Sequence, residues 1–144
     1  MNRMQKISLF SVVTISVAVV SSLIAVGYLY GKYGMPRAMR GLALLSIVSI
    51  SGLSLLLFKK DKGNVVFDER DRIISRRSAL AGFAAAYLFV GLACMVPFSV
   101  MGPRATLEVH WLPMIFMGAG ISHFFVYSLA ILIQYGCAGK GETP

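Results

Sequence analysis

Charged residues are scarce in this 144-residue chain. They make up 14% of it, against 57% hydrophobic residues, whereas a soluble domain carries about 25% charged residues. Runs of about 18 or more apolar residues are typical of transmembrane helices, because unpaired backbone groups are costly in hydrocarbon. The composition therefore excludes an ordinary soluble domain and predicts a single membrane domain over residues 1–144.

Charge is also missing from the places where ion-coupled transport needs it. The chain has 6 Asp and Glu and 14 Lys and Arg, and none lies inside an apolar run. Proton- or sodium-coupled carriers usually need an ionisable group within the membrane. The four-helix small multidrug carriers depend on a glutamate in their first span, where this chain has Ser and Thr. Both carrier classes are therefore disfavoured.

Signals of catalysis and cofactor binding are missing as well. The sequence has no Cys-x-x-Cys, no glycine-rich phosphate loop and no assignable Ser/His/Asp set. Its two cysteines, Cys94 and Cys137, fall near opposite membrane faces, whereas a disulfide needs Cα atoms within about 7 Å. We therefore expect free thiols, no metal, no cofactor and a non-enzymatic protein.

Four apolar runs are present, and they predict an all-α integral membrane protein with four transmembrane helices. The basic start before the first run could mark a signal peptide, but the run exceeds the usual apolar core of about 7–15 residues. Gly34 and Pro36 end the first run, and Trp111 marks the boundary of the fourth. The predicted spans cover residues 7–30, 41–58, 79–100 and 111–135.

The distribution of basic residues predicts the orientation. Both termini and the segment between the second and third runs hold ten Lys and Arg, and the two opposite loops hold Lys32, Arg37, Arg40 and Arg104. Because Lys and Arg accumulate on the cytoplasmic side, both termini are expected there, in the plasma (inner) membrane of a prokaryote. The same rule explains the net charge of +8 without nucleic-acid binding.

Small residues form a stripe along the third run. Ser78, Gly82 and Ala86 recur every four residues, whereas Leu80, Phe83, Tyr87 and Cys94 fall on the opposite side. A stripe of small side chains lets two backbones approach closely. We expect it to face a partner helix, within the chain or in a second copy of a homo-oligomer.

The only long polar stretch, residues 59–78, is called the hinge segment below. It holds seven of the 14 Lys and Arg and four of the 6 Asp and Glu. Asp68 resembles a helix N-cap, with Glu69 and Asp71 in the first turn, where carboxylates favour the positive end of the helix dipole. The third helix is thus expected to start near Glu69.

The hinge segment is also the candidate interaction site. In projection Asp68 and Asp71 continue the small stripe inward and need partners such as Arg3, Lys6, Lys59 or Lys60. Arg72 and Arg76 point outward, toward phospholipid headgroups. The alternative is a solvated helix start with surface ion pairs of at most about 1 kcal/mol. The site comprises Asp68, Glu69, Arg70, Asp71, Arg72, Arg76 and Arg77.

The run Asp68-Glu69-Arg70-Asp71, followed by Ile74 and a small-residue helix, resembles the Asp-Glu-Arg motif of a known family. That family comprises small archaeal and bacterial predicted membrane proteins of unknown function. Its motif lies in the central cytoplasmic loop of about four spans, and some members are similar to proteins encoded beside helix-turn-helix regulators. The specific match covers about ten residues, and the resemblance implies no activity.

His123 is a second candidate site. It lies twelve residues past Trp111, roughly 18 Å along a helix, and so near the middle of the bilayer. Histidine within a membrane is a functional candidate by default. The alternative is a hydrogen bond to a Ser or Thr of the first or second span.

These patterns predict a multi-pass membrane protein that acts through its hinge segment on a cytoplasmic protein partner or on anionic lipid headgroups of the membrane surface. The alternative is a small oligomeric transporter or channel that uses His123 and intramembrane hydroxyls.

Overall fold

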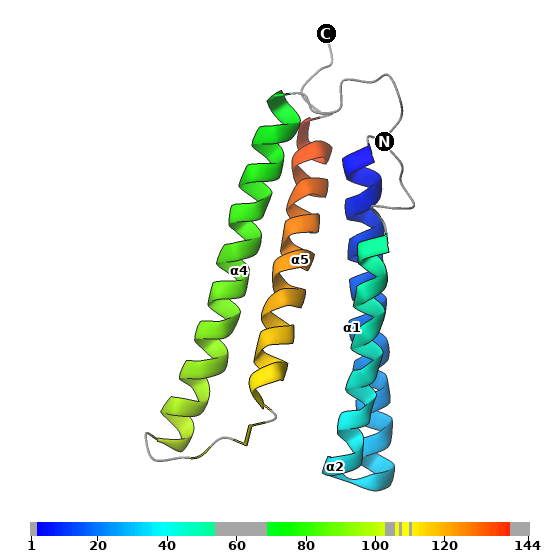
Figure 1. The fold of residues 1–144 in the computed structure, drawn as a ribbon, viewed down its shortest axis with the longest axis vertical. Helices are drawn as coiled ribbons and strands as arrows, with labels where there is room; N and C mark the ends of the chain where they lie inside the picture. The colour runs from blue at the N-terminus through cyan, green and yellow to red at the C-terminus, as the bar shows by residue number, and fades with distance from the viewer. Residues whose placement is uncertain (1–2, 54–68, 103–105, 107, 110, 139–144) are drawn as a thin grey trace. The chain divides into compact units, whose positions relative to one another are not determined.

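The computed structural model describes residues 3–53, 69–102, 106, 108–109 and 111–138 (Figure 1). Every regular element among them is helical, so the predicted all-α fold is confirmed for this part of the chain. Two compact units are present, Met1–Asn64 (unit 1) and Val65–Pro144 (unit 2). The elements are α1 (Arg3–Tyr33), α2 (Met35–Ala38), η1 (Met39–Leu53), α4 (Glu69–Met101) and α5 (Trp111–Ala138).

Three of these helices are long and apolar enough to cross a membrane. They cover Arg3–Tyr33, Glu69–Met101 and Trp111–Gly136, and they match the first, third and fourth predicted spans. The second predicted span, 41–58, is described only as far as Leu53, where the 15-residue 3₁₀ helix η1 ends. Its apolar helical stretch, Met39–Val48, is shorter than the other three.

Unit 1 is a helical hairpin in which η1 runs back along α1 (Figure 1). The chain reverses at Gly34, whose φ of 77° lies in the left-handed region that favours glycine. The Gly34 N–H donates to the Tyr30 carbonyl at 3.2 Å and closes α1. Pro36 stands in the first turn of α2, as the sequence predicts.

The two helices of unit 1 touch through their backbones. A Cβ on Gly41 of η1 would lie 2.7 Å from the Val26 backbone nitrogen, so only glycine fits there. Beside this contact the Ser22 hydroxyl donates to the Gly41 carbonyl at 3.3 Å. The buried face of α1 consists of Ser8, Ile15, Ala18 and Ser22.

Unit 2 is a second hairpin, formed by α4 and α5 (Figure 1). Ser78 and Gly82 of the small stripe are buried, and a Cβ on Gly82 would lie 2.8 Å from the His123 carbonyl oxygen of α5. The expectation that the stripe faces a partner helix is thus confirmed, and that partner lies within the chain. On the opposite side Leu80, Phe83, Tyr87 and Cys94 are exposed, as expected.

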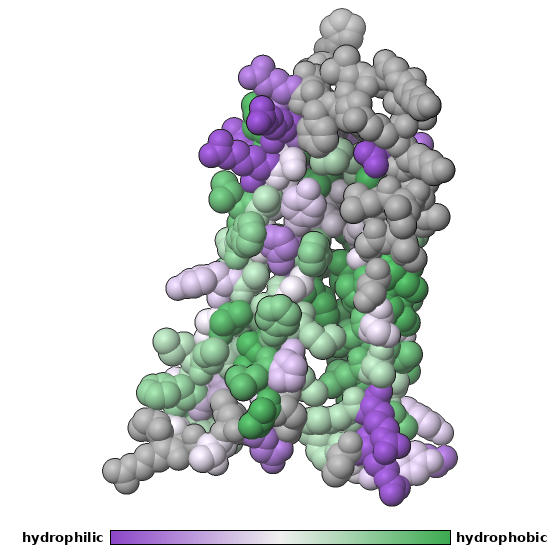
Figure 2. Space-filling model, in the orientation of Figure 1, coloured by the Kyte–Doolittle hydropathy of each residue, from purple (hydrophilic) through white to green (hydrophobic). Residues whose placement is uncertain are grey.

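Large apolar side chains lie mostly on the outside of both units. Tyr87 and Phe116 are 81% and 80% exposed, whereas four of the eleven buried residues that the structure describes are serines. Figure 2 shows hydrophobic residues along the length of α4 and hydrophilic residues over its start. Small and polar inside with large and apolar outside is the arrangement expected where lipid, rather than water, covers the surface.

Gly82→Leu is expected to lower both the folded yield and the melting temperature in detergent. The added side chain separates α4 from α5, and overpacking of this kind costs about 1–3 kcal/mol. Size-exclusion yield and thermal melting measure the effect. Tyr87→Leu, at a position 81% exposed, is the control and should melt like the unchanged protein. Equal losses in the two variants would mean that the packing face is misassigned. Phe83 is a poorer control because its ring lies 4.6 Å from that of His123.

Candidate functional site

A line of polar side chains joins α4 to α5 and begins in the first turn of α4. We call it the polar seam. On α4 its members are three or four residues apart and therefore share one helix face. Asp71 and Ser75 are half-buried and Ser78 is fully buried. The seam consists of Asp71, Ser75 and Ser78 on α4 and Tyr127, Gln134 and Tyr135 on α5.

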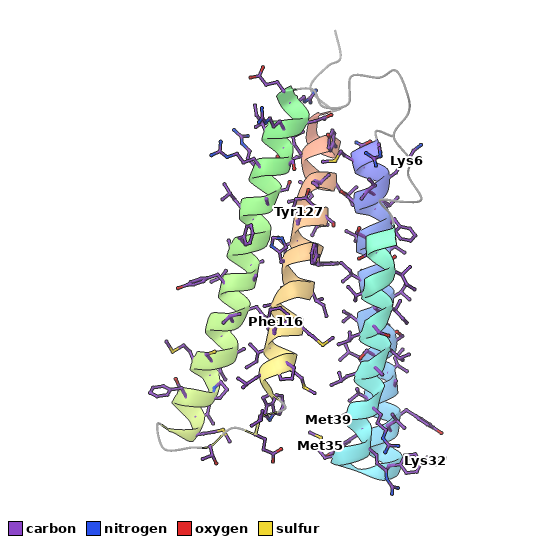
Figure 3. The ribbon with its side chains drawn as sticks, viewed as in Figure 1. Lys6, Lys32, Met35, Met39, Phe116 and Tyr127 are labelled. Carbon is purple, nitrogen blue, oxygen red and sulfur yellow. The ribbon has the colours of Figure 1, made fainter. Side chains whose placement is uncertain are left out.

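Each α4 member of the seam has a hydrogen-bond partner on α5. The Tyr135 hydroxyl donates to Oδ1 of Asp71, and Nε2 of Gln134 donates to Oγ of Ser78 at 3.0 Å. Oγ of Ser75 and the hydroxyl of Tyr127 (labelled in Figure 3) lie 3.5 Å apart. These bonds fix the rotation of α4 against α5 at the end of the hairpin that starts in the hinge segment.

Sequence reasoning missed the α5 half of the seam. Gln134 and Tyr135 follow Tyr127 by seven and eight residues, about two helical turns, which places both on the helix face of Tyr127. This spacing was the available signal. It is weak because tyrosines near the end of a span also suit the membrane interface, so the pattern alone does not separate an inward seam from an outward belt.

Asp71 is oriented as the sequence predicts, toward the helix interface. The Tyr135 hydroxyl is a partner of its carboxylate, and such a hydrogen bond to a carboxylate is charge-assisted. The predicted cationic partners stay predictions: Lys59 and Lys60 lie outside the described residues, and Arg3 and Lys6 belong to unit 1.

Asp68, the expected N-cap, also lies outside the described residues, whereas α4 begins at Glu69 as expected.

The other charged side chains at the start of α4 face outward. Glu69 is exposed. The guanidinium groups of the exposed Arg70, Arg72, Arg76 and Arg77 make no ion pair with any residue that the structure describes. The first turns of α4 therefore have two different sides, with a hydrogen-bonded carboxylate on the inside and, on the outside, four cations that no described residue pairs.

His123 packs among aromatic rings in unit 2. Its ring centroid lies 4.6 Å from that of Phe83 and 5.2 Å from that of Phe124, and it is stacked on Tyr127 at 6.3 Å. A Cβ on Gly82 would lie 2.9 Å from Nδ1, so the imidazole occupies the space that the glycine leaves.

Nδ1 of His123 is buried and has no hydrogen-bond partner among the described residues of unit 2. The expected hydrogen bond to a hydroxyl of the first or second span concerns unit 1 and stays a prediction, whereas within unit 2 the imidazole is held by aromatic packing. Within the described ranges no three His, Cys, Asp or Glu side chains are close enough to hold a metal ion.

Comparison of this chain with protein-family models, with curated proteins and with solved structures finds no match. The resemblance to the Asp-Glu-Arg family therefore stays a prediction, and the geometry of the chain itself has to carry any functional proposal.

Asp71→Ala is expected to destabilise the protein by about 1–3 kcal/mol, because it leaves the Tyr135 hydroxyl without its acceptor inside the hairpin. Glu69→Ala, at an exposed position two residues away, should change stability by less than about 1 kcal/mol. Thermal melting in detergent compares the two variants.

Tyr135→Phe tests the same bond from the other side. It should lose part of the stability that Asp71→Ala loses, and the two effects should not add in the double variant, since both remove one bond. Additive losses, or equal melting of Asp71→Ala and Glu69→Ala, would show that the bond contributes nothing.

Proposed function

We propose that this chain is a four-span membrane protein with both termini in the cytoplasm, and that the start of α4 binds anionic lipid headgroups at the cytoplasmic surface. Four exposed arginines without an ion pair among the described residues, Arg70, Arg72, Arg76 and Arg77, are the observation that carries the proposal. The role is one of attachment and positioning, without catalysis.

The depth of these arginines favours lipid over a protein partner. α4 has 33 residues and is therefore about 50 Å long, whereas the hydrocarbon core is about 30 Å thick. The apolar part begins at Ala79, so Arg76 and Arg77 adjoin it and Arg70 and Arg72 lie within about 14 Å of it along the axis. Arg76 and Arg77 therefore lie at the level of the phosphate groups, and the helix positions of Arg70 and Arg72 lie just beyond it, within reach of a long arginine side chain. Guanidinium binds phosphate in a bidentate manner.

The geometry of η1 supports four spans rather than three. A 3₁₀ helix rises about 2.0 Å per residue, so the 15 residues of η1 cover about 30 Å, the thickness that an α-helix needs about 20 residues to cross. With η1 as a further crossing there are four in all, and the chain returns to the side of its N-terminus. It also keeps the ten basic residues of the termini and hinge segment on one side.

Cysteine-accessibility labelling tests the topology. In a background with Cys94 and Cys137 replaced by serine, a cysteine at Asn64 should react with a membrane-impermeant reagent only after the cells are opened. A cysteine at Arg104 should react from outside. External labelling at position 64 would overturn the proposed orientation.

Arg72→Gln/Arg76→Gln tests the lipid contact. In nanodiscs, replacing part of a neutral phospholipid with phosphatidylglycerol should raise the melting temperature of the unchanged protein, since each arginine near the surface contributes about 1 kcal/mol with anionic lipid. The double variant should lose much of this increase, and about 0.5 M salt should reduce it in the unchanged protein.

Arg72→Lys/Arg76→Lys, which keeps both charges, is the matched control and should retain most of the increase. An undiminished increase in the Gln variant would contradict the lipid contact. If that variant instead lost a protein that the unchanged chain captures, a cytoplasmic protein partner would replace the lipid as the ligand.

One observation favours the alternative, a small oligomeric transporter or channel. Nδ1 of His123 is buried without a hydrogen-bond partner among the described residues, and a histidine within a span is a functional candidate. Solute flux in proteoliposomes that His123→Phe abolishes, while melting stays unchanged, would favour this function over surface attachment.

A further inference from the structure

The turn of unit 1, where α1 passes into α2 and η1, contains an open pocket of about 370 Å³. It is lined by Leu29, Tyr33, Arg37 and Arg40. Figure 3 labels Lys32, Met35 and Met39 at the same turn. Two of the four lining residues thus carry guanidinium groups, and both are exposed.

Tyr33 holds cations beside this pocket. Nζ of Lys32 lies 5.5 Å from the centre of its ring, and the guanidinium carbon of Arg37 lies 5.8 Å from it. Both distances are within the range of a cation–π contact. The ring therefore keeps two long cationic side chains close to the pocket and reduces the conformational freedom that each would lose on binding a ligand.

The cations of this turn have no counter-charge among the described residues of unit 1. The first 60 residues contain no Asp or Glu, so no carboxylate of residues 3–53 can pair with them. Lys32, Arg37 and Arg40 make no ion pair with any described residue. Within the described part of unit 1, therefore, no carboxylate offsets the mutual repulsion of these cations.

The helix dipole accounts for the position of only one of these three cations, Lys32. Lys32 lies in the last turn of α1, where a cation favours the negative end of the helix dipole. Arg37 and Arg40 gain no comparable benefit, because α2 has only 4 residues. In the topology proposed above, this turn is also on the side of the membrane from which basic residues are depleted. Two arginines kept there, on one pocket, point to a ligand.

We propose that this pocket binds a phosphate group, carried by an anionic phospholipid or by a soluble phosphate ester. Arg37 and Arg40 supply planar donors suited to two phosphate oxygens. Leu29 and the Tyr33 ring supply an apolar wall for the carbon atoms attached to the phosphate. The site is separate in the sequence from the arginines of α4 and does not depend on lipid binding by them; it rests on the proposed topology only where Arg37 and Arg40 are assigned to the side depleted of basic residues.

Arg37→Gln/Arg40→Gln tests the proposal in purified full-length protein in neutral detergent. Two ligands distinguish the sources: dioctanoyl phosphatidylglycerol, followed by native mass spectrometry, and glycerol phosphate, followed by the melting temperature. The unchanged protein should bind at least one of them with saturation. The double variant should bind that ligand at least about tenfold more weakly, since losing one or two charge-assisted hydrogen bonds costs that much or more.

Arg3→Gln/Lys6→Gln removes the same charge from the opposite end of α1, outside both proposed binding sites, and is the matched control, which should retain the binding. Without ligand, the Arg37→Gln/Arg40→Gln variant should melt close to the unchanged protein, because no carboxylate loses a partner. Saturable lipid binding alone identifies a headgroup site, and saturable glycerol phosphate binding identifies a site for soluble esters. Equal binding by the unchanged protein and the Arg37→Gln/Arg40→Gln variant, or no binding of either ligand, would overturn the proposal.

Discussion

Close backbone contact at two glycines is the constraint on which both hairpins depend. In lipid, burial of large apolar side chains drives no association, because the tails are as apolar as leucine. Dispersion contacts and hydrogen bonds remain, and both need short distances between helices. Gly41 against Val26 in unit 1, and Gly82 against His123 in unit 2, provide those distances. Ser22 and Ser78 then form hydrogen bonds that a wider separation would break.

This packing also explains where the charges lie. The inner faces of the helices are occupied by small residues and hydrogen-bonded hydroxyls, so cations are placed at the ends of the helices and outside. On α4 the one inward carboxylate, Asp71, is held by a tyrosine of the neighbouring helix. Six exposed arginines make no ion pair with a described residue: Arg37, Arg40, Arg70, Arg72, Arg76 and Arg77. Phosphate is the anion that a membrane offers in quantity.

Periodicity predicted much of unit 2 from the sequence. Four-residue spacing identified the face of α4 that contacts α5, and the carboxylates identified its start at Glu69, because both features are local. The partner of Asp71 was not predictable in this way. Charge alone suggested a lysine or arginine, whereas the structure gives Tyr135, 64 residues away, on a helix whose apolar pattern shows no preferred side.

The 3₁₀ conformation of η1 was also not predictable from the sequence, since its Leu, Ile, Val and Ser residues suit an α-helix as well. The structure nevertheless shows a three-residue period of burial. Arg40, Ala43 and Ser46 are exposed, whereas the next column is half-buried throughout: Met39, Leu42, Leu45, Val48 and Ser51.

Such a column is straight, because side chains three residues apart eclipse one another in a 3₁₀ helix. The inclined ridges of two α-helices interlock and so oppose sliding along the axis. A straight column lacks this interlock, and a shift of η1 by one turn, about 6 Å, would present the same column to α1 without rotation. Such a shift would, however, bring Ala38 or Leu44 to the place where only glycine fits against the Val26 backbone. The contact of Gly41 with Val26, together with the hydrogen bond from Ser22 to the Gly41 carbonyl, therefore sets the axial position of η1 along α1.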